Sequence, residues 1–247
     1  MRRSAMIFGV LTMIAGGAWQ SAGAQEEKNL IFRAVYEKTL NAQVSKGSPR
    51  ASVVPDDLAI VEEQGKKGVP IRGKAFLSYP GQGNFNPRQG TVLMRVKPDW
   101  AKAAGQYFIS AWANEPFGAF LFFAYSDGSL QLRIWNKELM MNIGSDKFNV
   151  NGGKWQNEWH QVGFTYNLDS GLVQIVADGA VVGGATVKDM PDLAGRNYGL
   201  GIGCNYNTGT NQFNGLINEV NIYDTALKFG AAAAPAARPA TEPQKKK

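Results

Sequence analysis

Alternation of apolar and polar residues with a period of two is the feature that most constrains how this chain can fold. In residues 90–98 (GTVLMRVKP), Val92, Met94 and Val96 fall on one side of an extended chain, and charged residues fall on the other. Residues 129–135 (SLQLRIW) repeat the pattern. Such alternation is typical of β-strands that bury one face. The sequence therefore predicts strands that pack over a core.

Two Asp-Gly pairs separate neighbouring runs of this kind, and each predicts a β-hairpin. Asp127-Gly128 divides residues 119–135, and Asp178-Gly179 divides residues 172–187. The pair favours hairpins because both residues accept the positive φ of a tight turn. Helical character is confined to short stretches such as residues 98–105 (PDWAKAAG). Many short strands with frequent turns predict an all-β sandwich.

Composition divides the chain into three parts. Residues 1–24 contain an early basic pair, an apolar run and small residues at Ala22 and Ala24, which is the pattern of a cleaved secretory signal peptide. An uncleaved anchor is the alternative, but the run is short for a transmembrane helix. Residues 25–228 have the length of one large β domain. Residues 229–247 are rich in Ala and Pro, then basic, and are expected to form a disordered tail. We therefore expect an extracytoplasmic protein, in the periplasm or at the cell surface.

The net charge of +6 comes mainly from the two ends of the chain. Two of the six excess positive charges lie in residues 1–24 and three lie in residues 229–247, which leaves one for the domain. A nearly neutral domain is a poor match for nucleic acid. The single cysteine, Cys204, cannot form an internal disulfide. Stability must therefore come from the core.

Four segments resemble laminin G-like domains of the concanavalin A-like lectin/glucanase superfamily. Residues 158–183 (EWHQVGFTYNLDSGLVQIVADGAVVG) are similar to the central hairpin of these domains, in which Trp-His precedes an apolar strand and the next strand ends in Asp-Gly. The other three are a strand that closes with Lys-Pro and a Trp (residues 90–100), the last strand (residues 213–227, FNGLINEVNIYDTAL) and the first strand with its loop (residues 29–47).

This resemblance extends over residues 28–228 and is least typical over residues 44–73. It implies a concanavalin A-like jelly-roll sandwich of two packed antiparallel sheets. The fold serves both enzymes and binding proteins, so the function has to be sought in the residues.

His160 is the only histidine of the chain. On a strand it shares its side with Val162, Phe164 and Tyr166, which favours a hydrogen-bonded core histidine over a catalytic one. The resemblance implies that Trp159 belongs to the core beside it.

The glycanases of the superfamily need two carboxylates that face one cleft. The chain has no acids spaced to share one side of a strand: Glu62 and Glu63 are adjacent and would point to opposite sides. Asp127, Asp169 and Asp178 are expected in turns, where Asp bonds to the backbone. The sequence therefore favours a protein without catalysis. A divergent glycoside hydrolase or glycan lyase, with acids that only folding brings together, is the alternative.

The sequence predicts no cofactor. It has no His/Cys cluster with zinc spacing. Calcium is the open alternative, because the resemblance implies a site near the last strand, where Asn218-Glu219 stands in place of the usual Asp-Glu. An Asn amide oxygen can bind calcium but carries no charge.

A candidate ligand face follows from alternation. Trp135 falls on the polar side of its strand with Gln131 and Arg133, and Arg95 falls on the polar side of another. If these strands share a sheet, they form a polar face with one aromatic platform, which suits a sugar ring. A Trp135 that only covers a sheet end is the alternative. Four further residues are candidates for the rim: Trp112, Asn114, Tyr206 and Asn207.

These features together predict a secreted binding module. Its expected partner is carbohydrate or another extracellular macromolecule, with a domain that only contacts protein as a further alternative.

Overall fold

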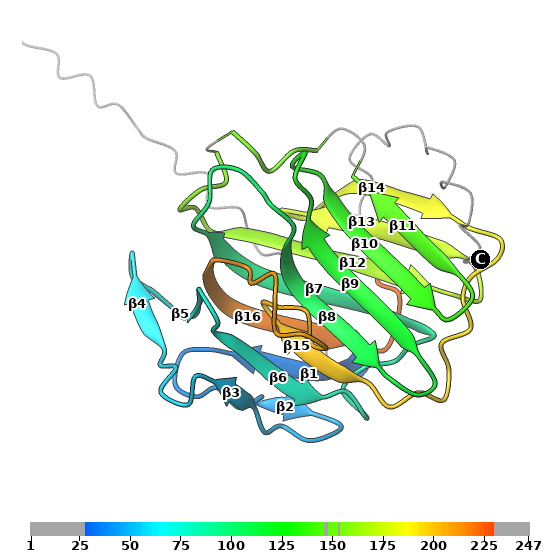
Figure 1. Ribbon diagram of the computed structural model, residues 1–247, viewed down its shortest axis with the longest axis horizontal. Helices are drawn as coiled ribbons and strands as arrows, with labels where there is room; N and C mark the ends of the chain where they lie inside the picture. The colour runs from blue at the N-terminus through cyan, green and yellow to red at the C-terminus, as the bar shows by residue number, and fades with distance from the viewer. Residues whose placement is uncertain (1–27, 146–147, 153, 230–247) are drawn as a thin grey trace, which may run out of the picture.

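The computed structural model describes residues 28–145, 148–152 and 154–229 (Figure 1). The regular structure in these ranges is almost entirely β, in sixteen strands. The predicted signal peptide and nearly all of the predicted tail lie outside the described residues. No helix in the described ranges is both long enough and apolar enough to cross a membrane.

The strands form two antiparallel sheets that pack face to face, so the predicted sandwich is confirmed (Figure 1). Sheet A has the order β14 (Ala180–Thr186), β13 (Leu172–Ala177), β12 (His160–Asn167), β7 (Gln89–Pro98), β16 (Gly215–Tyr223), β1 (Leu30–Val35) and β2 (Val44–Ser45), and the hairpin of β4 (Val61–Glu63) and β5 (Lys66–Ile71) joins it through β16. Sheet B has the order β11 (Met140–Gly144), β10 (Leu130–Asn136), β9 (Gly118–Ala124), β8 (Gln106–Ala113), β15 (Gly199–Ile202), β6 (Phe76–Pro80) and β3 (Ser52–Val54).

The core lies between the sheets and is built from the apolar sides of their strands. Val92 and Val96 of β7 are fully buried, as are Leu130 and Leu132 of β10. The alternation that the sequence showed in these two strands therefore separates core from surface, as predicted.

Both predicted Asp-Gly hairpins are present. Asp178 and Gly179 have φ values of 47° and 81°, as a two-residue hairpin turn requires. In the other turn Gly128 has a φ of 87°, and the Asp127 carboxylate accepts a hydrogen bond of 2.8 Å from the Ser129 amide. The expected helical character of residues 98–105 is absent, and the structure has no helix there.

His160 makes the side-chain hydrogen-bond contact that the sequence predicted, but it is only partly buried and is not one of the core residues. Its ring stacks on Trp155 with centroids 3.9 Å apart, and its Nδ1 lies 2.9 Å from the Asp178 carboxylate. The expectation that Trp159 belongs to the core is wrong. Because β12 begins at His160, Trp159 falls on the opposite side of the chain and contacts Gly68 of β5. Trp155, which is 7% exposed, belongs to the core instead.

Candidate functional site

Strand β10 turns its alternate residues toward the outer face of sheet B, and these are the residues that the sequence predicted as a ligand face. Leu132 and Ile134 are fully buried between the sheets. Gln131, Arg133 and Trp135 therefore point outward, as predicted.

The centre of this outer face is aromatic and apolar. Tyr107, Leu121 and Phe123 are on the outer side but are only 8%, 2% and 3% exposed, because neighbouring side chains cover them. The cause is β9, whose sequence GAFLFFA is apolar at every position and has no polar side. The prediction of a polar face with a single aromatic platform is therefore wrong.

Three aromatic side chains meet at one end of this face, and we refer to Trp112, Phe117 and Trp135 as the aromatic cluster. The Phe117 centroid lies 4.6 Å from that of Trp135 and 5.1 Å from that of Trp112, and the two indoles are 5.9 Å apart. All three pairs meet edge to face, as the ring quadrupoles favour. The Trp112 Nε1 donates to Asn114 Oδ1 at 2.9 Å, which places the predicted rim residue Asn114 beside the cluster.

An open pocket of about 1010 Å³ lies against the cluster, a volume suited to a small ligand. Three segments enclose it: the turn between β8 and β9, the end of β10 and the loop before β15. The residues that line the pocket are Asn114, Glu115, Pro116, Phe117, Trp135, Lys137 and Arg196.

Arg196 is held against the pocket by backbone carbonyls. Its Nε donates to the Phe117 carbonyl and its Nη1 to the Ala194 carbonyl, both at 3.0 Å. Gly118 makes this approach possible, since a Cβ there would lie 2.6 Å from Arg196 Cδ. The neighbouring Tyr198 hydroxyl donates to a carbonyl at 3.1 Å, and burial raises its pKa above the ordinary value. The tyrosine is therefore a neutral donor at physiological pH.

The other predicted residues of β10 lie outside the pocket. The Arg133 Nε donates to Asn142 Oδ1 at 2.7 Å, and its guanidinium lies 5.5 Å from the centroid of Phe123. Gln131 donates to Ser129 Oγ at 3.1 Å, near the opposite end of the strand. Arg133 therefore covers part of the apolar centre of the face.

Tyr206 lies on the same face, over β15. A Cβ at Gly199 would lie 2.0 Å from the Tyr206 ring, so the ring takes the place of a side chain at that position. Because Gly199 pairs with Trp112, the ring is next to the aromatic cluster along the sheet. Asn207 belongs to the exposed turn that follows, where its amide donates to Asn205 Oδ1 at 3.1 Å.

Arg95 cannot belong to this face. It lies on β7 in sheet A, where Gln161 and Glu219 are its cross-strand neighbours. Its outward side is therefore on the far side of the sandwich from Trp135. The sequence could not show this, because alternation assigns a side of a strand but not the sheet to which the strand belongs.

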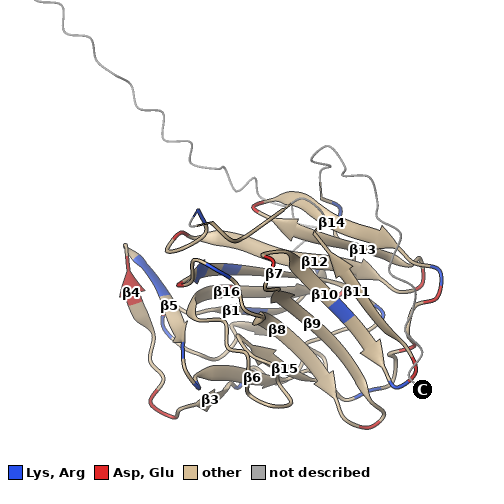
Figure 2. Ribbon diagram, turned by 45° about the horizontal axis from the view of Figure 1, so that its top comes forward, with Lys and Arg blue, Asp and Glu red and all other residues tan. Residues whose placement is uncertain are grey.

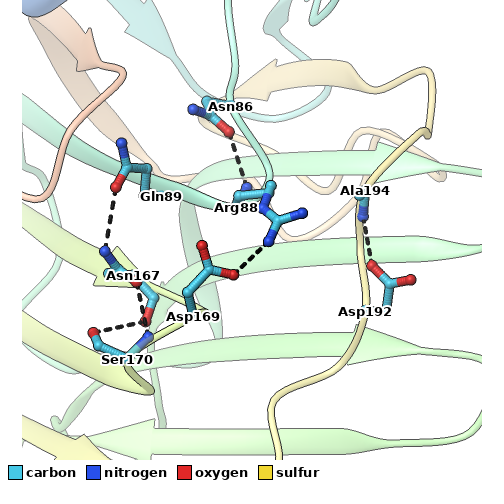
Figure 3. A network of polar contacts seen from close by, with 8 residues as sticks. All are labelled: Asn86, Arg88, Gln89, Asn167, Asp169, Ser170, Asp192 and Ala194. Atoms are coloured by element: carbon cyan, nitrogen blue, oxygen red, sulfur yellow. Dashed lines mark hydrogen bonds and ion pairs between the residues drawn. The ribbon is translucent and has the colours of Figure 1, made fainter.

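A polar network joins neighbouring loops at one end of the sandwich (Figure 3). The Arg88 guanidinium contacts the Asp169 carboxylate at 2.6 Å, which joins the start of β7 to the turn after β12. Asn167 donates to Gln89 Oε1 at 3.2 Å, and its own Oδ1 accepts from the Ser170 amide at 2.9 Å. Asp169, which the sequence assigned to a turn, thus orders that turn.

The region of the possible calcium site is occupied by protein contacts. Asn218 donates to the Lys67 carbonyl at 2.8 Å, and the Glu219 carboxylate pairs with Arg33 at 3.1 Å and accepts from Asn221 at 2.9 Å. Across residues 28–145, 148–152 and 154–229, no three His, Cys, Asp or Glu side chains gather as a metal site would require.

Five pocket residues were missed by the sequence interpretation: Glu115, Pro116, Phe117, Lys137 and Arg196. All five come from turns or loops, where alternation has no meaning. Phe117, which lies between Pro116 and Gly118, could have indicated the pocket from the sequence, because a large ring in a turn needs a surface to pack against.

Residues 72–229 match the model of the family described as the concanavalin A-like lectin/glucanases superfamily. The match begins where the least typical segment of the chain, residues 44–73, ends. No curated protein sequence matches the chain significantly.

Similar solved structures include domain 4 of AbnA, an extracellular arabinanase from Geobacillus stearothermophilus, in complex with arabinotriose. It is 18% identical, with a TM-score of 0.63 over 81% of this chain and 94% of that one. A botulinum neurotoxin type C structure, described as dependent on two ganglioside molecules for cell entry, is 14% identical, with a TM-score of 0.61 over 83% of this chain. The binding domain of botulinum neurotoxin DC, in complex with rat synaptotagmin II, is 14% identical, with a TM-score of 0.59 over 82% of this chain. This chain spans half of each toxin chain.

At these identities the likeness establishes the fold alone. The family match covers well over half of the chain, and the two packed antiparallel sheets agree with it. The chain therefore belongs to the concanavalin A-like lectin/glucanase superfamily.

Proposed function

We propose that this protein is an exported binding module that holds carbohydrate in the pocket beside the aromatic cluster and does not transform it. The observation that carries the proposal is the pairing of an aromatic wall with polar side chains. Trp135 and Phe117 supply the aromatic part of the lining, and the polar side chains include Asn114, Lys137 and Arg196. A sugar ring has an apolar face for the aromatic side chains and hydroxyl groups for the amide and the guanidinium.

Two of the similar structures support carbohydrate as the ligand class. The arabinanase domain is in complex with arabinotriose, and the type C toxin interacts with gangliosides. The toxin domain bound to synaptotagmin favours the second candidate, which is a protein partner. The apolar centre of the face around Leu121 and Phe123 suits that candidate too, although Arg133 covers part of it.

The acids around the pocket favour binding over hydrolysis. Glycoside hydrolases use a pair of carboxyl groups about 5–9.5 Å apart on either side of the scissile bond. Among the described residues that line the pocket, Glu115 is the only acid. A second carboxylate for acid-base or nucleophilic chemistry is therefore not supplied by the pocket lining.

A glycan array probed with the mature protein, with and without calcium, tests the proposal. We expect saturable binding to a defined set of neutral or charged glycans, unchanged by chelation. Hits should be incubated with the protein and assayed for new reducing ends. Release of reducing ends would establish an enzyme, and an empty array combined with capture of an extracellular protein would favour the protein partner.

A further inference from the structure

A second pocket lies on the far side of the sandwich from the aromatic cluster. It forms where the β4–β5 hairpin meets the outer face of sheet A, and its volume is about 320 Å³. Figure 2 shows basic residues along β5 beside acidic residues on β4. The charged side chains that line the pocket are Lys38, Lys66, Lys67 and Arg95, with the acids Glu37 and Glu62.

Two of the three pocket lysines, Lys66 and Lys67, lie on the β4–β5 hairpin, which is held in place at its turn and along β16. Gln64 and Gly65 have φ values of 54° and 71°, which closes β4 and β5 with a tight two-residue turn directly before Lys66. The Asn218 side chain donates to the Lys67 carbonyl at 2.8 Å and ties the hairpin to β16. At Gly68 a Cβ would lie only 3.1 Å from a β16 carbonyl, so the strands pack closely.

Positive charge exceeds negative charge in this pocket. Four cations line it against two acids. None of the ion pairs found among the described residues includes Lys38, Lys66 or Lys67. Partial desolvation of the exposed Lys66 side chain, and then the nearby charge of Arg95, lower the pKa of Lys66 below its ordinary value. Lys66 and Arg95 are therefore close enough to repel each other, and a bound anion would offset that repulsion.

The concentration of charge is local. Residues 25–228 carry a single excess positive charge, so a basic pocket is not the product of a generally basic surface. Oxyanions suit it, because ammonium groups and the Arg fork both donate charge-assisted hydrogen bonds. The two glutamates can accept hydrogen bonds from the hydroxyl groups of a ligand. The same carboxylates would repel the phosphate groups of a phosphodiester backbone. A charged sugar supplies the oxyanion and the hydroxyl groups together.

We propose that this pocket binds the carboxylate or sulfate group of an acidic polysaccharide, as a second site independent of the pocket at Trp135. Its volume is at the lower end of the range for small-ligand sites, so it holds one charged sugar residue of a longer chain. The proposal does not depend on the function assigned to the aromatic cluster.

Calorimetric titration with three oligosaccharides of equal length tests this site: oligogalacturonate, a sulfated dextran and neutral dextran. We expect one of the charged oligosaccharides to bind more tightly than neutral dextran, and its identity separates carboxylate from sulfate. Lys66→Gln and Lys67→Gln should each weaken that binding by about two- to fivefold, within the range for one exposed ion pair. The exposed lysines Lys102 and Lys154 provide the matched controls Lys102→Gln and Lys154→Gln, which should leave the affinity unchanged.

Three outcomes would overturn the site. Equal losses in the pocket and control variants would mean a diffuse charge effect. Equally tight binding of a single-stranded RNA or of an acidic peptide would mean a different class of ligand. Loss of charged-sugar binding in Trp135→Ala, with Lys66→Gln unaffected, would move the anion to the aromatic pocket. Because Lys66 and Lys67 are exposed, thermal melts of their variants should match the wild type and so confirm that each variant is folded.

Discussion

At the scale of single residues, Trp135 belongs both to sheet B and to the lining of the candidate ligand pocket. Its ring packs on Phe117 and also lines the pocket. We expect Trp135→Ala to weaken binding of the glycan found by array by about 1–3 kcal/mol, as aromatic anchors do. Tyr125→Ala is the matched control, because Tyr125 is an exposed aromatic residue near the same sheet but outside the pocket. Equal losses in both variants would remove Trp135 as the anchor.

The core tryptophan beside His160 is Trp155, not Trp159 as the sequence suggested. Trp155 is buried and stacked on His160, whereas Trp159 is half-buried outside the core. Trp155→Ala should therefore lower the free energy of unfolding by about 3–5 kcal/mol, the range for buried aromatic truncations. Trp159→Ala should cost clearly less. Urea denaturation of both variants gives the comparison, and the reverse order would show that the assignment is wrong.

At the scale of elements, the loop after β15 packs against β15 at Gly199, where the absence of a side chain leaves room for the Tyr206 ring. Gly199→Ala would place a methyl group 2.0 Å from the Tyr206 ring. We expect a loss of about 1–3 kcal/mol of stability, typical of overpacking. The loss should disappear when Tyr206→Ala is introduced in the same chain, because the two changes are coupled. A double-mutant cycle by thermal unfolding checks this, and additive effects would contradict it.

At the scale of elements, the sequence predicted individual strands correctly but not the sheet to which each strand belongs. Alternation identified the strands around Val92 and Leu132 correctly, because each buries one side. It could not show that β9 separates β10 from β8, nor that Arg95 belongs to the other sheet. Sheet membership depends on pairing between distant segments, which leaves no periodic signal. The positions of turn and loop residues such as Arg196 could not be predicted from the sequence either, since they depend on tertiary contacts.

At the scale of the whole molecule, the end of the described chain is attached to sheet A. The Leu227 amide donates to Thr91 Oγ1 at 2.9 Å, and that hydroxyl lies 2.9 Å from the Thr225 carbonyl oxygen. Truncation after residue 229 should leave the melting temperature unchanged, because the removed segment has no apolar pattern. Truncation after Asp224 should lower it, since buried Thr91 then loses both contacts. Differential scanning calorimetry distinguishes the two.

The buried acids of the core make the fold sensitive to alkali. Burial raises the pKa of Cys204 from 9.0 to about 12 and that of Tyr79 from 10.0 to about 12. Between about pH 9 and 12, both groups stay neutral in the folded state but ionise in the unfolded state. Their contribution to the free energy of unfolding is therefore complete below about pH 9 and is lost as the pH rises toward 12. Urea denaturation should show constant stability between about pH 7 and 9 and a decline above that. Cys204→Ala should make the decline shallower, and an identical slope would exclude the thiol as a source.

The pocket beside the aromatic cluster is lined by three segments that are far apart in the chain, at Phe117, Trp135 and Arg196. The unfolded chain has no such pocket, so a ligand binds only the native state. By thermodynamic linkage, a ligand present at one hundred times its dissociation constant adds about 2.7 kcal/mol to the free energy of unfolding. Each ligand that binds this pocket should therefore raise the melting temperature of the protein. A thermal-shift screen of unlabelled compounds is a direct way to identify the ligand.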